Sequence, residues 1–279
     1  MKNNIYKLSI ILLLVFSFYY TNIMINFIQS KDPIMIKIKE TNNKYKINYK
    51  NATIKGNNII SGKNGKTINY KESYHKMKKY GSYNESLTVL KEVTPKVSIN
   101  NNYNKYIIKG NSENKNIALV FIVNKDTNPS TILSILNNKK VLGTFFIDGT
   151  YLENNIDMIR SMKIHELELL SYNNEYNSSY FKTSLYYLEN LSGKKCKYCF
   201  TEYDNNNLLN LCSKNHLHTI KPTLYLKNNI YSSIKKNISN SIIISFEINN
   251  YVERELSTSI DYIKSKGYNL VTLDTLISE

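Results

Sequence analysis

The chain has 279 residues, of which 42% are hydrophobic and 21% are charged, and its formal net charge is +15. This composition is that of a globular protein, and the length allows one sizeable domain with a smaller one beside it. The positive charge would favour polyanions such as nucleic acid, anionic lipid or phosphate-bearing wall polymers. The sequence has no zinc-finger spacing, RNP-like aromatic motif or arginine stripe, so nucleic-acid binding has no second line of support.

A membrane-spanning helix is predicted near the N-terminus. Lys2 and Lys7 precede an apolar run over residues 8–27, and about 20 helical residues cross a hydrocarbon core about 30 Å thick. No small-x-small cleavage site follows, which favours an uncleaved signal anchor. The leading lysines favour a cytoplasmic N-terminus. Residues 1–30 are therefore expected to be a cytoplasmic stub and anchor of a single-pass cell-membrane protein, whose exported remainder has no nucleic-acid partner.

Residues 31–115 are expected to form a small α+β module, in which no residue pattern indicates a catalytic or binding function. Apolar residues alternate over residues 34–38 and 45–49, which is the period-two pattern of short strands. Tyr70, Tyr74 and Met77 share one face of a predicted helix that Gly81 ends. The other elements expected in the module are a turn at residues 62–65, a strand at residues 96–99 and a solvated histidine at position 75.

The three cysteines do not make a metal site. Cys196 and Cys199 form a CxxC pair and Cys212 follows later, but a structural zinc site needs four ligands and no second pair lies nearby. A disulfide between two of the three and a set of free thiols are both open alternatives.

From residue 116 onward strands alternate with helices, which predicts a parallel sheet covered by helices. Residues 117–123 are continuously apolar, as expected of a strand buried on both faces. Asn128 and Pro129 begin a predicted helix, and the clearest helix covers residues 251–266. Further strands are expected at residues 141–147, 167–171, 242–245 and 269–272.

Residues 116–279 resemble the NodB-homology polysaccharide deacetylases. The residues that carry the resemblance stand in the family's order and spacing: Ala118-Leu119-x-Phe121, Thr144-Phe145-Phe146 with Gly149, His165-Glu166, Gly193-Lys194-Lys195, Gly267-Tyr268 and Val271-Thr272-Leu273. The resemblance implies a distorted (β/α) barrel. It also implies a zinc ion and a bound N-acetylated glycan at the C-terminal ends of the strands.

The groups that this chemistry needs are missing at the corresponding positions. A metal lowers the pKa of a bound water, a carboxylate takes its proton, and a histidine protonates the leaving amine. The resemblance places the base and the metal-binding Asp at Ile122 and Val123, the two ligand histidines at Leu170 and Asn174, and the general acid at Phe246. The Arg-Pro-Pro-Tyr motif retains only Tyr203. No metal site, cofactor or catalytic residue of the family kind is therefore predicted.

A different set of polar residues could line a groove at the barrel mouth. The candidates are Asp148, Glu168, Tyr172, Asn174, Glu202, Tyr203 and Glu247. Two of these carboxylates about 5–10 Å apart could act as a glycosidase pair, although solvated carboxylates are the simpler interpretation. His216 and His218 are expected at the surface, and His165 is expected to have a local structural role.

Three functional hypotheses follow. The first is a membrane-anchored extracytoplasmic deacetylase-like pseudoenzyme that binds or scaffolds cell-envelope glycan. Tyrosine side chains are suited to sugar contact, because they combine an aromatic face with a polar tip. The second is an active, divergent deacetylase or other hydrolase of N-acetylated cell-wall polysaccharide. The third is a structural module that binds an envelope protein.

Overall fold

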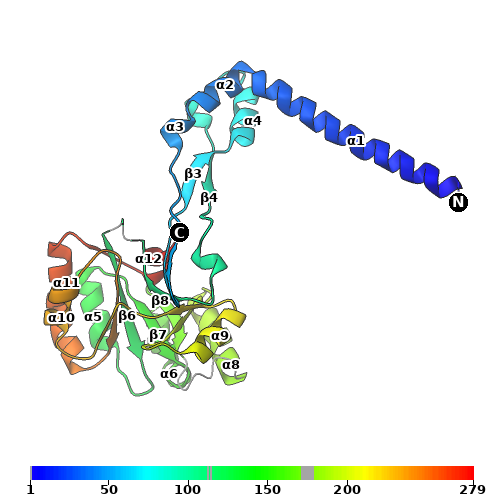
Figure 1. The fold of residues 1–279 in the computed structure, drawn as a ribbon. Coiled ribbons are helices and arrows are strands. Elements are labelled where there is room, and N and C mark those ends of the chain that lie inside the picture. The colour runs from blue at the N-terminus through cyan, green and yellow to red at the C-terminus, as the bar shows by residue number, and fades with distance from the viewer. Residues whose placement is uncertain (1, 112, 114, 171–178) are drawn as a thin grey trace. The chain divides into compact units, whose positions relative to one another are not determined.

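The structure, a computed structural model, describes residues 2–111, 113, 115–170 and 179–279. The chain divides into two compact units, one of Met1–Tyr49 and Asn64–Val93 and the other of Lys50–Lys63 and Thr94–Glu279 (Figure 1). The chain therefore passes from one unit to the other three times. The expected boundary at residues 115 and 116 does not coincide with any of these crossings.

The first unit begins with the long helix α1, whose segment Ile10–Lys31 is long and apolar enough to cross a membrane. A small core of Ile34, Ile38, Ile68 and Met77 holds the rest of the unit together. Its helices and strands are α1 (Lys2–Lys31), α2 (Pro33–Glu40), α3 (Asn42–Tyr45), β3 (Gly65–Ile68), α4 (Tyr70–Tyr80), the 3₁₀ turn Glu85–Leu87 and β4 (Leu90–Val93).

The strand predicted at residues 34–38 is helix α2. The Asp32 side chain accepts a hydrogen bond of 2.9 Å from the Ile34 backbone N–H, and Pro33 occupies the first turn. Both are helix-start signals, and they outweigh the alternation of isoleucines. The buried residues are Ile34, Met35 and Ile38, which is helical spacing.

Two further strand predictions were wrong. Residues 45–49 lie in the end of α3 and in a segment with an isolated bridge from Ile47 to Lys66. Residues 96–99 lead into a 3₁₀ turn at Ile99–Asn101. The predicted helix is confirmed as α4, with Ser73 and Met77 buried. Gly81 ends it in the left-handed conformation at φ 96°, which glycine adopts without a steric penalty.

The second unit contains two sheets of mostly parallel strands. The first sheet has the order β1-β2-β5-β10-β9, and the second has the order β11-β12-β6-β7-β8 with β13 paired to β6. The strands are β1 (Thr53–Lys55), β2 (Asn58–Ile60), β5 (Tyr106–Lys109), β6 (Asn116–Val123), β7 (Thr144–Asp148), β8 (Glu166–Leu170), β9 (Tyr198–Phe200), β10 (His218–Ile220), β11 (Leu224–Leu226), β12 (Ile243–Glu247) and β13 (Asn269–Val271).

Helices connect and cover these strands, as the alternation of elements predicted. Helices α5, α10 and α11 lie together on one side of the second sheet (Figure 1). The connecting helices are α5 (Ser130–Lys139), α6 (Gly149–Asn154), α7 (Ile156–Ser161), α8 (Ser179–Ser192), α9 (Asn206–Lys214), α10 (Ile230–Asn237), α11 (Asn250–Ser265) and α12 (Leu273–Ile277). The unit is thus an α/β fold of the expected kind.

Two apolar clusters fill the second unit because side chains alternate between the faces of each strand. The inner cluster contains Val120 and Ile122 of β6 together with Phe146, Leu170 and Phe200. The outer cluster lies between the sheet and the helices and contains the alternate residues Phe121 and Val123. Helix α11 adds Val252, Leu256, Ile260 and Ile263 to the outer cluster, which confirms the predicted stripe.

Residues 50–63 and 94–115 belong to this unit because they complete its first sheet. Parallel pairing joins β2 to β5 and β5 to β10, so removing them would leave β10 with an open edge. This arrangement was not predicted, because β1, β2 and β5 have only three or four residues each and β10, a parallel partner of β5, is more than a hundred residues away.

Candidate functional site

The C-terminal ends of the strands carry apolar side chains at the positions expected for the catalytic base, Ile122, and for a metal ligand, Leu170. Ile122 and Leu170 are only 4% and 7% exposed, and both belong to the inner cluster with Phe146 and Phe200. The rings of these two phenylalanines lie 5.3 Å apart. Aliphatic side chains have no donor atom for a metal, so these two positions hold the interior together by packing alone.

The other two described family positions face the opposite side of the sheet. Val123 and Phe246 belong to the outer cluster under the helices, and the Phe246 ring stacks on Phe121 at 5.2 Å. The positions therefore do not converge on one pocket. Asn174 and the groove candidate Tyr172 lie outside the described residues.

Asp148 is a helix cap and not a free groove carboxylate. Its Oδ1 accepts hydrogen bonds from the backbone N–H groups of Thr150 at 2.9 Å and Tyr151 at 3.2 Å. The side chain lies at the start of α6 and is 7% exposed. Two of the N–H groups at the helix start thus find a partner in this carboxylate.

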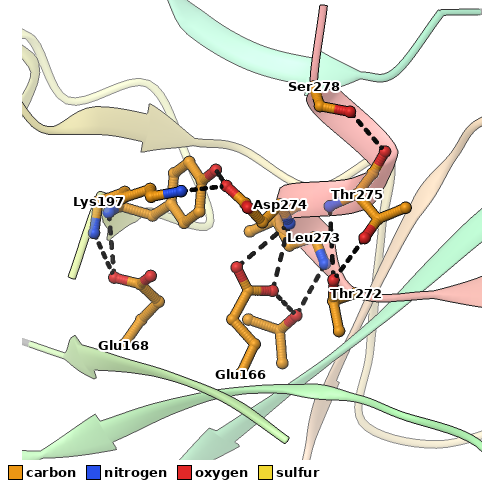
Figure 2. Close-up of polar contacts among 10 residues, drawn as sticks. Glu166, Glu168, Lys197, Thr272, Leu273, Asp274, Thr275 and Ser278 are labelled. Carbon is orange, nitrogen blue, oxygen red and sulfur yellow. Dashed lines mark hydrogen bonds and ion pairs between the residues drawn. The ribbon is translucent and has the colours of Figure 1, made fainter. Parts of the chain in front are cut away.

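Glu168 lies on the seam between the two sheets. One carboxylate oxygen accepts hydrogen bonds from the backbone N–H groups of Lys197 at 2.8 Å and Tyr198 at 3.1 Å, where β9 begins (Figure 2). Burial raises the pKa of Glu168 well above its usual range, and the neighbouring Glu166 raises it further. This places Glu168 toward the N-terminal end of β9, which corrects its prediction as a mouth residue.

A polar cluster does form at the ends of β9, β11 and β12. The Glu247 carboxylate is 2.8 Å from the Lys227 ammonium and accepts a hydrogen bond of 3.0 Å from the Tyr225 hydroxyl. Hydrogen bonding to Lys227 holds the pKa of Glu247 below its usual value. Glu202 and Tyr203 belong to the same cluster, because Glu202 raises the pKa of Tyr203 by hydrogen bonding and contributes to the raised pKa of Lys227.

Three predicted groove residues, Glu202, Tyr203 and Glu247, are thus brought together. Lys227 and Tyr225 are the members that the sequence did not predict. Strand β11 is only three residues long, and its sequence shows no clear alternation by which these side chains could have been placed at the mouth. The cluster can bind polar groups through Lys227 and an exposed Tyr203 ring, but its central carboxylate is already ion-paired.

Two histidines occupy buried structural positions. His165 is 2% exposed, and its Nδ1 accepts a hydrogen bond of 3.2 Å from the Gly143 N–H, which fits the predicted local role. His218 is 7% exposed and its ring stacks on Tyr103 at 4.2 Å. Its expected surface position was therefore wrong. Burial lowers the pKa of His218 to about 4, so the ring is neutral at neutral pH.

The cysteines and the acidic residues do not form a metal centre in the described part of the chain, where no group of three or more His, Cys, Asp or Glu could hold an ion. Cys199 and Cys212 form a disulfide, and Cys196 is a buried free thiol. The disulfide joins β9 to α9, which settles the alternatives that the cysteine spacing left open.

Comparison with solved structures shows which fold this is. The wild-type BA3943 protein, a CE4 family pseudoenzyme from Bacillus anthracis, aligns with 88% of this chain and 95% of its own, with 19% identity and a TM-score of 0.64. The peptidoglycan N-acetylglucosamine deacetylase Bc1960 aligns with 62% of this chain and 92% of its own, with 19% identity and a TM-score of 0.56. A chitin deacetylase from the fungus Colletotrichum lindemuthianum aligns with 63% and 92%, with 21% identity and a TM-score of 0.53.

Sequence comparison adds one curated relative. The uncharacterized protein YlxY of Bacillus subtilis is 31% identical over 148 residues, which is 52% of this chain and 46% of that protein. The matched segment thus spans about half of the relative's length. No protein-family model matches the chain.

The second unit has the fold of the polysaccharide deacetylases of carbohydrate esterase family 4. The predicted divergent NodB-homology fold is confirmed by these structures.

Proposed function

We propose that this chain is a membrane-anchored extracytoplasmic protein whose deacetylase-like domain has lost catalysis and binds or scaffolds cell-envelope glycan. The observation that carries the proposal is the packing of Ile122 and Leu170 into one buried cluster with Phe146 and Phe200. Restoring a metal site there would require polar groups inside a close-packed apolar cluster, which is costly unless a metal satisfies them.

The structural neighbours support this proposal. The match to the BA3943 pseudoenzyme is too long to be confined to the second unit, whereas the deacetylases match about three fifths of the chain. The two deacetylases are described as acting on peptidoglycan and on chitin. A cell-envelope glycan is the corresponding partner proposed for this chain.

Extracytoplasmic placement is supported by the disulfide. Disulfides persist in oxidising compartments and are rare in reducing ones. The leading Lys2 and Lys7 favour a cytoplasmic N-terminus, whereas Lys31, Lys37 and Lys39 on the other side of the apolar part oppose it, so the orientation of α1 needs its own test. Cysteine-accessibility mapping in intact cells tests the orientation: a cysteine introduced at Ser82 should react with a membrane-impermeant maleimide, whereas one at Asn4 should not.

Metal content and acetate release test the loss of catalysis. The full chain, purified in a non-ionic detergent, is expected to hold no stoichiometric zinc by mass spectrometry and to release no acetate from peptidoglycan or N-acetylglucosamine oligomers. A family 4 deacetylase assayed in parallel serves as the positive control. Acetate release above the protein-free blank would overturn the proposal.

The rival hydrolase hypothesis rests on the mouth carboxylates. If Glu202 or Glu247 performed catalysis, Glu202→Gln and Glu247→Gln would abolish any turnover that the full chain shows. The ion pair between Glu247 and Lys227 speaks against this role, because a general acid at neutral pH needs a raised pKa. Crosslinking in intact cells tests the third hypothesis, since recovery of a specific protein instead of glycan would favour an interaction module.

A further inference from the structure

A cavity of about 770 Å³ opens at the end of the second unit opposite the family's site. We call it the basal cavity. Its walls come from residues at or just before the N-terminal ends of β8 and β9 and from the start of α12. In a fold of this class the catalytic groups gather at the other ends of the strands. The basal cavity therefore is separate from the polar cluster of Lys227 and Glu247.

The carboxylates of the basal cavity are already occupied. Glu166 accepts the backbone N–H of Asp274 at 3.2 Å and the hydroxyl of Thr144 (Figure 2). Asp274 is 2.7 Å from the Lys197 ammonium and accepts a hydrogen bond of 2.7 Å from the Tyr198 hydroxyl. Glu168 accepts the two N–H groups at the start of β9.

The charge of these carboxylates is reduced or offset within the protein. Burial is the main cause that raises the pKa of both Glu166 and Glu168, so each is less readily ionised than a free glutamate. The charge of Asp274 is balanced by Lys197. The described carboxylates of the cavity thus all have partners within the protein.

Three lysines add positive charge to the wall of the cavity, and of these Lys194 also acts on a described carboxylate, since its charge helps to lower the pKa of Asp274. Lys140, Lys194 and Lys195 line the basal cavity and are exposed. Among the residues that the structure describes, no carboxylate forms an ion pair with any of the three, whereas Lys197 on the same wall is paired. Three lysines lining one cavity provide a favourable site for a group of high negative charge.

The remaining wall indicates what kind of anion fits. Thr272 and Thr275 contribute hydroxyl groups, and Leu142 and Ile164 are exposed by 41% and 64%. Arginine, which recognises planar carboxylates through two parallel hydrogen bonds, is absent from the lining. Lysine binds phosphate as a point charge and needs no fixed orientation. The apolar rim can accommodate the carbon chain that carries the phosphate.

We propose that the basal cavity binds phosphate groups of an anionic envelope polymer whose repeat is a polyol phosphate. The lysines hold the phosphates, and Leu142 and Ile164 contact the carbon backbone. The hydroxyls of Thr272 and Thr275 share one hydrogen bond of 3.0 Å, so one of the two can donate to a phosphate oxygen. The cavity exceeds the size of one phosphate, so consecutive repeats of the polymer can enter together. This site is independent of the mouth, and it would bind its ligand whether or not the mouth is catalytic.

Binding of a fluorescent poly(glycerol phosphate) oligomer to the full chain in non-ionic detergent tests the site. The wild-type chain should bind the oligomer at about 0.05 M salt and lose most of the binding at about 0.5 M, because salt screens exposed charges. The triple variant K140Q/K194Q/K195Q should bind about tenfold more weakly. The double variant K194Q/K195Q should show an intermediate loss, and near-ultraviolet circular dichroism verifies that both variants are folded.

The control variant K214Q/K235Q/K236Q removes the same charge from three exposed lysines outside the cavity. It should bind within about twofold of the wild type, since it lowers only the general field of the protein. Equal losses of affinity in the control and in K140Q/K194Q/K195Q would overturn the proposed site. An affinity of K140Q/K194Q/K195Q equal to that of the wild type would also overturn it. Complete displacement of the oligomer by inorganic phosphate at an equal phosphate concentration would overturn the proposal of a polymeric ligand and assign the cavity to free phosphate. The binding experiment measures neither acetate nor zinc, so a failure of this inference is distinct from a failure of the proposed function.

Discussion

Glu168 has a structural role that its residue type did not suggest. β8 and β9 are the end strands of the two sheets, and the Glu168 carboxylate joins them by accepting two backbone N–H groups of β9. The sequence identified Glu168 as polar and close to a strand end, but alternation could not tell which end of the fold it serves. A buried acceptor for otherwise unpaired N–H groups is retained for folding, because an unsatisfied donor costs about 1–3 kcal/mol.

The pH dependence of stability should report this buried carboxyl group. The folded-state pKa of Glu168 is raised above its unfolded value, so the folded chain holds the proton more tightly, and stability decreases as pH rises from about 4.3 through the folded pKa. Glu168→Gln keeps an oxygen acceptor and removes the titration. The free energy of unfolding of Glu168→Gln minus that of the wild type should therefore increase from pH 5 to pH 7. Urea unfolding of the full chain in detergent measures it.

Glu153→Gln removes a carboxylate from an exposed position of α6 and is the matched control, whose difference from wild type should change much less with pH than that of Glu168→Gln. A Glu168→Gln curve parallel to that of the wild type over this range would contradict the assignment. Glu168→Ala should be destabilised at every pH, since it leaves both N–H groups of β9 without an acceptor.

The family positions show what residue patterns can and cannot predict. The loss of the base at Ile122 and of a ligand at Leu170 followed directly from residue type, and burial in the inner cluster agrees with it. That Val123 lies on the opposite face from Ile122 could also be predicted, because adjacent residues of a strand face opposite sides. Phe246 lies on the outer face for the same reason as Phe121. The partners of Glu247 could not be predicted, since they come from a strand of three residues.

At the scale of elements, long periodic segments were predicted well and short ones were not. β6, α4 and α11 each have a pattern that extends over many residues, and each was found close to its predicted bounds. Helix α2 was missed because Asp32 and Pro33 determine its start, whereas the isoleucine alternation spans only five residues. The strands β1, β2 and β5 are fixed by pairing with distant strands, which no local pattern encodes.

The disulfide predicts a thiol count. The denatured full chain should contain one reactive thiol without reductant, that of Cys196, and three after reduction, because Cys199 and Cys212 are bonded to each other. Titration with a chromogenic disulfide reagent in guanidinium measures both values. Cys196→Ala is the control and should give zero and two thiols. Three thiols in the unreduced protein, freshly isolated under acid quench, would contradict the pairing.

Loss of the disulfide should also loosen α9. Cys199 and Cys212 are 13 residues apart, and closing a loop of roughly that size stabilises a protein by about 3 kcal/mol in the chain-entropy description. The variant C199A/C212A should therefore unfold at lower urea concentration than Cys196→Ala, although both remove buried sulfur. Equal unfolding midpoints for the two variants would show that the crosslink adds no stability.

At the scale of the whole molecule, the two units are interleaved in sequence. The second unit takes residues 50–63 as well as residues 94–279, and its first sheet includes strands from both segments. Composition and motifs indicated a boundary near residue 116, because the deacetylase resemblance begins there. The strands that complete the sheet precede that point and have no family motif of their own.

Truncated variants test whether the second unit needs residues 50–63 and 94–115 or only the residues from Asn116 onward. A variant that begins at Lys50 and replaces residues 64–93 by a short glycine-serine linker should fold as a soluble monomer, because Gly65 and Val93 are paired neighbours that a short linker can replace. A variant that begins at Asn116 should aggregate, because β10 loses its partner β5. Size-exclusion chromatography and near-ultraviolet circular dichroism measure the outcome. Cooperative folding of the shorter variant would show that the earlier strands are dispensable.

The three crossings between the units also determine how the protein responds to proteases. A cut at one crossing, or at two, leaves the folded units joined through the remaining peptide connection. Within the first unit, the start of α2 and helix α4 are additionally held together by the ion pair of Asp32 with Lys78 at 2.7 Å. Separation of the two folded units therefore requires three separate cleavages, so a single nick at one crossing cannot release the second unit from the first.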